Sequence, residues 1–295
     1  MKYAYIHIGT PKTGTTALQK TLVSNLSVLK EKGYLYPKTG LWARGHSDAH
    51  HNLAYQLYNS PFFDPKHGTL EQLVSEIKMW NGDVIISSEI FVGLYNNQKK
   101  LSLLKGVFDT CGLDSIVIIY LRDLIEYVEK MYAEFVKNHF LTINMNKFSN
   151  HIISNKNFIL YDNWEFCFDY FEIIKKIAFV FGKENIICVK YKNKATINSF
   201  SKIIGVELLN KENKEIIMNK TDGPKTTEIL RIINNILDKS NLNEVERHHL
   251  NQTISNKLKG FDKEYSFNIN DKNIRILEDI NGKMFSKIEK IAKII

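Results

Sequence analysis

The chain contains 295 residues, with 44% hydrophobic and 24% charged side chains, 15 Gly and 5 Pro, a composition that excludes a disordered, collagen-like or low-complexity protein. The net charge of +8 predicts a surface that attracts anions, although no long basic block is present. The longest apolar runs, such as Ile116 to Leu121, are far shorter than the ~20 residues that cross a bilayer, and the N-terminus lacks the pattern of a signal peptide.

The first segment of the chain predicts a strand, a loop and a helix. Tyr3 to Ile8 is apolar and β-rich, which is typical of a strand buried on both faces of a parallel sheet. Leucines at helical spacing from Leu18 to Leu29 predict a helix that ends near Gly33. Similar patterns predict strands at 83–88, 115–121 and 185–191, and helices at about 125–138 and 166–178. Strands that alternate with helices indicate an α/β fold with a mainly parallel central sheet flanked by helices.

The remaining segments are less regular or mainly helical. From Tyr34 to Lys78 we expect loops and short helices over one edge of the sheet. Helical spacing returns at 226–237, 244–258 and 273–294. No sharp change in composition separates these parts. We therefore expect a single domain over 1–295, with an α/β nucleotide-binding core at 1–200 and a mainly helical extension at 201–295.

Three cysteines, Cys111, Cys167 and Cys188, are widely spaced and odd in number. This pattern fits buried thiols in a reducing compartment better than a disulfide framework or a zinc site. We therefore expect a cytoplasmic protein.

The sequence between the first strand and the first helix is rich in Gly, Thr and Lys. It reads Gly9-Thr-Pro-Lys12-Thr-Gly14-Thr-Thr16. Backbone N–H groups in such a turn, together with the positive end of the helix dipole, bind phosphate groups. A glycine turn that only connects a strand to a helix is the simpler interpretation, but the added Lys and hydroxyl groups favour anion binding.

The position of the lysine distinguishes two kinds of phosphate chemistry. A nucleoside-triphosphatase loop has Lys directly after its second Gly, followed by a Ser or Thr that holds Mg²⁺. Here Thr15 stands at that position, and Lys12 lies inside the loop before Gly14, where it would reach toward the group being transferred. A P-loop nucleotide kinase-like phosphotransferase remains the alternative function.

Pro11-Lys-Thr-Gly-Thr-Thr16 resembles the 5′-phosphosulfate loop of sulfotransferases that use 3′-phosphoadenosine-5′-phosphosulfate (PAPS). Arg122, at the end of a predicted strand, resembles the arginine of the family's 3′-phosphate motif, whereas Lys130 stands where that motif has Ser. Weaker similarities continue at Ser87-Ser-Glu89 and at 182–186, and His50-His-Asn-Leu-Ala54 resembles a segment of bacterial members that modify glycans.

The resemblance implies a P-loop-like sulfotransferase fold. It implies transfer of a sulfuryl group from PAPS to a hydroxyl or amine of an acceptor, a carbohydrate or glycan precursor, without a metal ion. The donor-binding residues carried over from the family are Pro11, Lys12, Thr13, Gly14, Thr15, Thr16, Arg122 and Lys130. Lys12 is expected to stabilise the charge that develops on the leaving group.

The acceptor must also lose a proton, which requires a general base. Glu89 follows a predicted strand, so its side chain should emerge at the carboxyl edge of the sheet beside Lys12. His50 and His51 have ordinary pKa values closer to neutral pH, but they lie in the irregular segment. We expect Glu89 to be the base and His50 or His51 to orient the acceptor, with a histidine base as the alternative.

A nucleic-acid binder is a third possibility, suggested by Tyr, Phe and Lys interleaved from Lys156 to Lys194. We favour it least, because most of these aromatic residues fall in segments expected to be core. The expected partners are thus a nucleotide donor and a small-molecule or glycan acceptor, and not nucleic acid.

Overall fold

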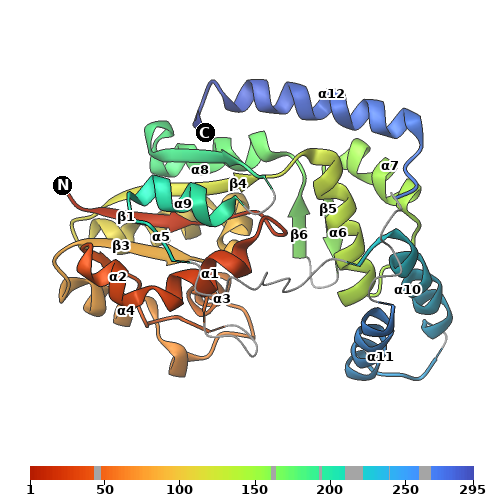
Figure 1. Ribbon diagram of the computed structural model, residues 1–295, viewed down its shortest axis with the longest axis horizontal. Helices are drawn as coiled ribbons and strands as arrows, with labels where there is room; N and C mark the ends of the chain where they lie inside the picture. The colour runs from red at the N-terminus through yellow and green to blue at the C-terminus, as the bar shows by residue number, and fades with distance from the viewer. Residues whose placement is uncertain (43–47, 161–163, 193–194, 210–221, 239, 259–266) are drawn as a thin grey trace. The chain divides into compact units, whose positions relative to one another are not determined.

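The computed structural model describes residues 1–42, 48–160, 164–192, 195–209, 222–238, 240–258 and 267–295 (Figure 1). The chain divides into two compact units that alternate along the sequence. The first unit comprises Met1–Arg122, Tyr170–Met218 and Met284–Ile295, and the second comprises Asp123–Asp169 and Asn219–Lys283.

The first unit is built on a parallel sheet of six strands in the order β2-β3-β1-β4-β7-β8. Each neighbouring pair in this sheet is parallel. The strands are β1 (Tyr3–His7), β2 (Tyr34–Leu35), β3 (Asp83–Ser87), β4 (Asp114–Leu121), β7 (Ile186–Lys190) and β8 (Lys293–Ile294). The predicted α/β class with a parallel central sheet is confirmed, and β1 lies between β3 and β4, so its end is flanked by two other strand ends.

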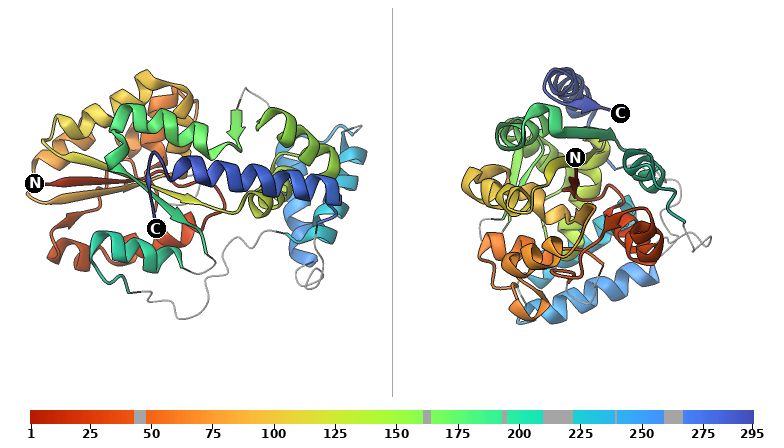
Figure 2. Two further views of the ribbon diagram at one scale, coloured as in Figure 1. Left: turned by 90° about the horizontal axis from the view of Figure 1, so that it is seen from above. Right: turned by 90° about the vertical axis from the view of Figure 1, so that its left-hand side faces the viewer.

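Helices cover both faces of this sheet (Figure 2). On one face, Leu18 and Phe200 pack into a buried cluster with Ile118 and Tyr120 of β4. On the other face, α5 and α8 contact β4 and each other. The helices of the first unit are α1 (Thr15–Ser24), α2 (Leu26–Glu31), α3 (His51–Tyr58), α4 (Leu70–Lys78), α5 (Gln98–Asp109), α8 (Tyr170–Phe181) and α9 (Thr196–Ile204), with short 3-10 helices η1 (Pro65–His67), η2 (Glu89–Asn96) and η4 (Lys183–Asn185). Apolar residues at helical spacing thus form a stripe along each helix, and this stripe packs against the sheet.

The second unit is mainly helical. It contains α6 (Leu124–Asn138), α7 (Met145–Asn155), the antiparallel hairpin β5 (Asn157–Leu160) and β6 (Trp164–Cys167), α10 (Pro224–Leu237), α11 (Glu244–Lys257) and most of α12 (Asp271–Ile288). Aromatic rings form its core: the Phe135 ring centroid lies 5.8 Å from that of Phe148 and 5.4 Å from that of Phe158.

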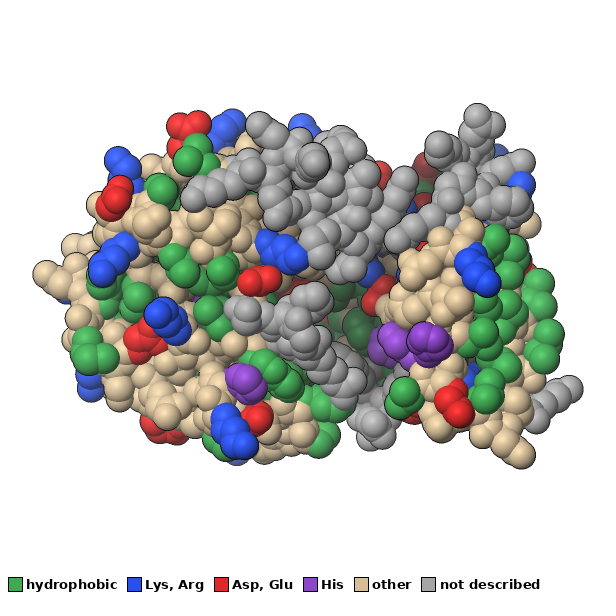
Figure 3. All heavy atoms as spheres, turned by 60° about the horizontal axis from the view of Figure 1, so that its bottom comes forward, with side chains coloured by type: hydrophobic (Ala, Val, Ile, Leu, Met, Phe, Trp, Pro, Cys, Tyr) green, Lys and Arg blue, Asp and Glu red, His purple; other side chains and the backbone are tan. Residues whose placement is uncertain are grey.

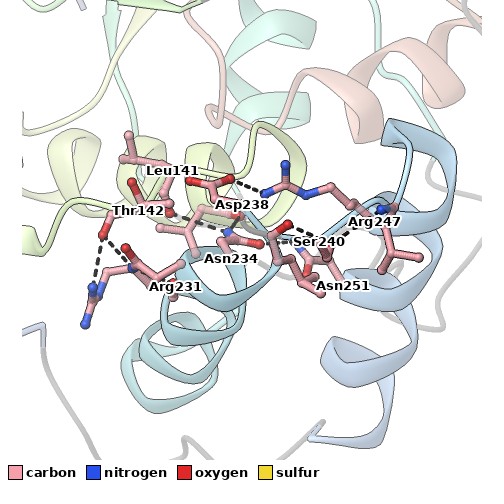
Figure 4. Close-up of polar contacts among 12 residues, drawn as sticks. Leu141, Thr142, Arg231, Asn234, Asp238, Ser240, Arg247 and Asn251 are labelled. Atoms are coloured by element: carbon pink, nitrogen blue, oxygen red, sulfur yellow. Dashed lines mark hydrogen bonds and ion pairs between the residues drawn. The ribbon is translucent and has the colours of Figure 1, made fainter.

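Buried amides join the helices of this second unit (Figure 4). The Asn234 amide donates to the Val136 carbonyl oxygen at 2.7 Å, and the Asn251 amide donates to the Asn234 side-chain oxygen at 3.1 Å.

On the surface of α10, Ile232 and Ile236 are exposed, and hydrophobic side chains gather on the surface of this unit (Figure 3).

Two predicted helices differ from the structure at their ends. Phe166 belongs to β6, and the helix expected from 166 begins only at Tyr170, because Phe166 pairs across the hairpin and its ring packs 4.8 Å from the Phe135 ring. The helix predicted over 273–294 ends at Ile288, because Lys293 and Ile294 pair with β7 and occupy the sheet edge.

The division of the chain also differs from the expected boundary at residue 200. Residues 123–169, expected in the α/β core, group with the helices after 222 because α10 and α11 both pack on α6. Among the residues that the structure describes, no helix is long and apolar enough to span a membrane.

Candidate functional site

The loop between β1 and α1 has two residues in the left-handed region. Lys12 has φ 65° and Gly14, the residue before α1, has φ 79°. A Cβ atom at Gly14 would lie 2.9 Å from Oγ1 of Thr196, so glycine fits this position in both conformation and space. The turn brings the N-terminus of α1, where the first N–H groups of a helix have no partner within the helix, to the carboxyl edge of the sheet.

Arg122 holds this loop at Lys12. Its Nε and Nη2 atoms donate to the Lys12 carbonyl oxygen at 3.1 and 2.6 Å. The guanidinium carbon lies 4.1 Å from the centre of the Tyr191 ring, and Arg122 is only 5% exposed. An arginine expected to meet the 3′-phosphate therefore also fixes the backbone of the residue expected to meet the transferred group.

Hydroxyl groups fix the rest of the loop. Thr10 donates to the Tyr120 carbonyl oxygen at 2.7 Å, and Thr13 donates to the Thr10 carbonyl oxygen at 2.6 Å. Thr196 of α9 donates to the Thr13 carbonyl oxygen at 3.1 Å. Thr13 and Thr15 are buried, whereas Pro11, Lys12 and Thr16 are half-buried.

Glu89 lies two residues after the end of β3, the strand adjacent to β1, as the sequence predicts. Its Oε2 atom accepts a hydrogen bond from the Gln19 amide at 2.8 Å and lies 3.7 Å from Nε2 of His51. Burial raises the pKa of Glu89, but His51, the Gln19 hydrogen bond and His7 outweigh that effect and leave the pKa below its usual value. The carboxylate is thus ionised near neutral pH, as a proton acceptor must be.

His51 is the histidine of the adjacent pair that lies beside Glu89. Its Nδ1 atom is 2.7 Å from Oγ of Ser88, which fixes the ring at the start of α3. The side chains of His51 and Glu89 are 12% and 22% exposed, so both are accessible to a bound molecule at the edge of the sheet.

His50 has a structural role. Its Nδ1 accepts a hydrogen bond from the Ser87 N–H at 3.1 Å, and its Nε2 donates to the Pro37 carbonyl oxygen at 3.0 Å. The ring is fully buried, and burial lowers its pKa to about 4. Both ring nitrogens of His50 are bonded to backbone, so of the two adjacent histidines His51 is the one that lies beside Glu89, and its expected contact with an acceptor stays a prediction.

Lys130 lies on α6 in the second unit, where it is half-buried. Its expected contact with the 3′-phosphate stays a prediction. Among the described residues, no group of three or more His, Cys, Asp or Glu side chains is arranged to hold a metal ion.

Two side chains of the site were missed in the sequence. Gln19 lies on α1 and bonds to Glu89, and His7 lies at the end of β1 with Nδ1 2.7 Å from Oγ of Ser87. His7 is completely buried, and burial lowers its pKa to about 4. The only sequence signal for His7 is a polar residue at the end of an apolar strand, directly before the loop.

Comparison with the models of known protein families gives no match, and no curated protein is significantly similar to the chain. The geometry of the loop and of the Glu89–His51 pair therefore carries the functional argument.

Proposed function

We propose that this protein is a PAPS-dependent sulfotransferase with a P-loop-like sulfotransferase fold. It transfers a sulfuryl group to a hydroxyl or amine of a carbohydrate or glycan precursor. The observation that carries the proposal is the placement of a Lys-containing glycine loop and an ionised carboxylate at the ends of two adjacent parallel strands, β1 and β3. Ligands of open α/β sheets bind at this edge.

The loop fits a phosphosulfate group. Gly14 brings the backbone close to the entrance of α1, where a side chain would collide with Thr196. Lys12 supplies a positive charge within the loop, and Thr16 supplies a half-buried hydroxyl at the first turn of α1. Thr15 stands where a nucleoside-triphosphatase loop has its lysine, which favours sulfuryl over phosphoryl transfer.

The reaction then needs three events. The acceptor oxygen forms a bond to sulfur as the bond between sulfur and the bridging oxygen breaks, and adenosine 3′,5′-bisphosphate leaves. Lys12 stabilises the negative charge that grows on the bridging oxygen. Glu89 takes the proton of the acceptor hydroxyl, and His51 orients that hydroxyl.

Aromatic residues beside His51 support a carbohydrate acceptor. The Tyr55 ring lies 6.4 Å from the His51 ring and 6.2 Å from the Trp42 ring, and Trp42 stacks on His67 at 4.8 Å. Aromatic rings that carry a polar group, next to a carboxylate, can contact both the apolar faces and the hydroxyl groups of a sugar.

The cytoplasm is the proposed location, because Cys111, Cys167 and Cys188 are all free thiols, although only Cys188 is buried and the other two are half-buried.

Calorimetry with two nucleotides tests the proposal. We expect adenosine 3′,5′-bisphosphate to bind without metal, and ATP to bind more weakly whether or not Mg²⁺ is present. Tight ATP binding that depends on Mg²⁺, with weak binding of the bisphosphate, would instead show a kinase-like protein.

A further inference from the structure

Beneath the loop, the imidazole of His7 has an unpaired nitrogen. The side chain is 0% exposed, and its Nε2 atom has no hydrogen-bond partner among the residues that the structure describes. An unpaired polar atom in the interior destabilises a folded protein, so a native structure that keeps one often binds something there. An apolar ring at this position would avoid that cost.

One ring nitrogen of His7 is bonded and the other is not. Nδ1 lies 2.7 Å from Oγ of Ser87, so Nε2 is the nitrogen available to a bound group. In the neutral imidazole only one of the two nitrogens carries a proton. In the imidazolium both nitrogens carry one, so the charged ring can donate to Ser87 and to a ligand at Nε2 at the same time.

Nε2 of His7 faces the loop. A Cβ atom at Gly9 would lie 2.8 Å from Nε2 and 3.0 Å from Cγ2 of Thr15, so the nitrogen lies between the first glycine of the loop and the start of α1. The rings of Tyr120 and Phe200 lie edge-on to the imidazole, at 5.5 and 6.1 Å between centroids. A charge on His7 would thus act in a dry environment directly beneath the loop.

We propose that His7 is an anion-binding residue of the loop: when a phosphosulfate or phosphate group binds there, the imidazole of His7 takes up one proton from solvent, and the imidazolium balances part of the charge of the bound group. The inference rests on the proposed function and adds to it a residue and a proton. Burial keeps the ring neutral without a ligand, with a pKa of about 4, and a nearby anion reverses that preference.

Other titratable groups surround His7, and they determine which control variants the experiment needs. Glu89, after β3, favours protonation of His7, and the loop itself contributes the positive Lys12. From β4 the facing group is Tyr120, whose pKa burial raises to about 12. His51, beside Glu89, is a second imidazole near the site, so an experiment must separate its titration from that of His7.

The test measures how the binding of adenosine 5′-phosphosulfate depends on pH. The phosphosulfate group of this probe stays fully ionised between about pH 6 and pH 8, so any proton taken up belongs to the protein. We expect the association constant of the wild type to rise as pH falls across this range, by up to about tenfold per pH unit for one linked proton. Calorimetry in buffers with different ionisation enthalpies counts that proton directly.

The His7→Asn variant keeps a donor near the Nδ1 position toward Ser87 but lacks Nε2. We expect it to bind the probe with an association constant that does not change with pH. The matched control is the exposed His151→Asn in the second unit, which should keep the pH dependence of the wild type. Thermal unfolding of each variant checks that the fold is retained.

Three outcomes decide the inference. A pH-independent association constant in the wild type, or the same pH dependence in His7→Asn, overturns the role of His7 and leaves the proposed function intact. Absence of probe binding to the wild type overturns the proposed function, and the inference with it. If His7→Asn does not fold, ¹⁵N NMR of the wild-type imidazole replaces it: on binding, the neutral ring with one N–H must become an imidazolium with an N–H at both nitrogens, and unchanged signals overturn the inference.

Discussion

Gln19 on α1 donates a hydrogen bond of 2.8 Å to the carboxylate of Glu89 at the end of β3. Gln19 is 4% exposed, and α1 is the helix that begins at the loop. The hydrogen bond therefore fixes the carboxylate relative to the loop, and it is one of the interactions that lower the pKa of Glu89. Gln19 is a positioning residue in the proposed reaction, and it gives the first prediction.

Replacing Gln19 by Met keeps the size of the side chain and removes the hydrogen bond. Without this hydrogen bond, which lowers the pKa of Glu89, the effect of burial raises that pKa. We therefore expect the acid limb of the pH–rate profile to move to higher pH. Turnover at neutral pH should fall, whereas binding of adenosine 3′,5′-bisphosphate should not change. Gln56→Met on α3 serves as the control and should keep the wild-type profile. An unshifted profile in Gln19→Met would show that the hydrogen bond does not act on catalysis.

Lys12→Ala should reduce turnover by roughly 10²–10³, the usual effect of removing one group that stabilises developing charge. Its effect on stability should be small, because Lys12 is only half-buried. Steady-state kinetics and thermal unfolding measure the two quantities. Lys20→Ala, further along α1, is the matched control and should stay within about twofold of the wild type. Near-normal turnover in Lys12→Ala would remove the lysine from the mechanism.

Arg122→Ala should weaken the binding of two nucleotides unequally. Loss of the two hydrogen bonds to the Lys12 carbonyl oxygen loosens the loop and affects both adenosine 5′-monophosphate and adenosine 3′,5′-bisphosphate. Loss of a direct contact with the 3′-phosphate affects the bisphosphate alone, by a further ~10–100-fold. The exposed Arg275→Ala is the control. Equal losses for both nucleotides would mean that Arg122 acts only by holding the loop.

Gly9→Ala should destabilise the fold, because the new Cβ would lie 2.8 Å from Nε2 of His7. Overpacking of this kind costs about 1–3 kcal/mol. In a His7→Ala background the ring is absent, so the same Gly9→Ala change should cost less. Chemical denaturation of the two single variants and the double variant measures this coupling. Strictly additive effects would place His7 and Gly9 out of contact.

Acid should destabilise the protein between about pH 6.5 and pH 4. Burial lowers the pKa of both His7 and His50 to about 4, so the folded state binds fewer protons than the unfolded state in this window. Each histidine then reduces the free energy of unfolding by about 1.4 kcal/mol for every unit that the pH falls. His50→Gln keeps a donor toward Pro37 and should reduce this dependence by about one proton. The exposed His151→Gln should leave it unchanged, and an unchanged slope in His50→Gln would contradict the prediction.

The central strands were predictable because each is a continuous apolar run followed by a helical pattern. The short edge strands β2 and β8 were not predictable, because each has two residues and is defined by its neighbour in the sheet. The segment around Phe166 was wrongly predicted to be a helix for a related reason. Its aromatic ring packs on Phe135, which lies far away in the sequence, so the local pattern does not show this contact.

The residues of the candidate site also fall into two groups: those that the sequence could predict and those that it could not. The positions of Lys12 and Glu89 after two adjacent strands could be predicted from the sequence pattern, whereas their chemical roles stay predictions. Gln19 and His7 could not, because their partners lie 70 and 80 residues away, and a polar residue at the end of an apolar strand is only a weak signal for His7. The different surroundings of His50 and His51 are evident only from the contacts of each ring.

The alternation of the two units along the chain bears on how the protein is made. Residues 284–295 complete the first unit, and a ribosome translates them after all of the second. Until they emerge, the outer edge of β7 lacks its hydrogen bonds, including that from the Ile295 N–H to the Cys188 carbonyl oxygen at 2.9 Å. We therefore expect the second unit to fold first during synthesis. Nascent chains stalled before β8 would then expose a sheet edge that chaperones or neighbouring chains can bind.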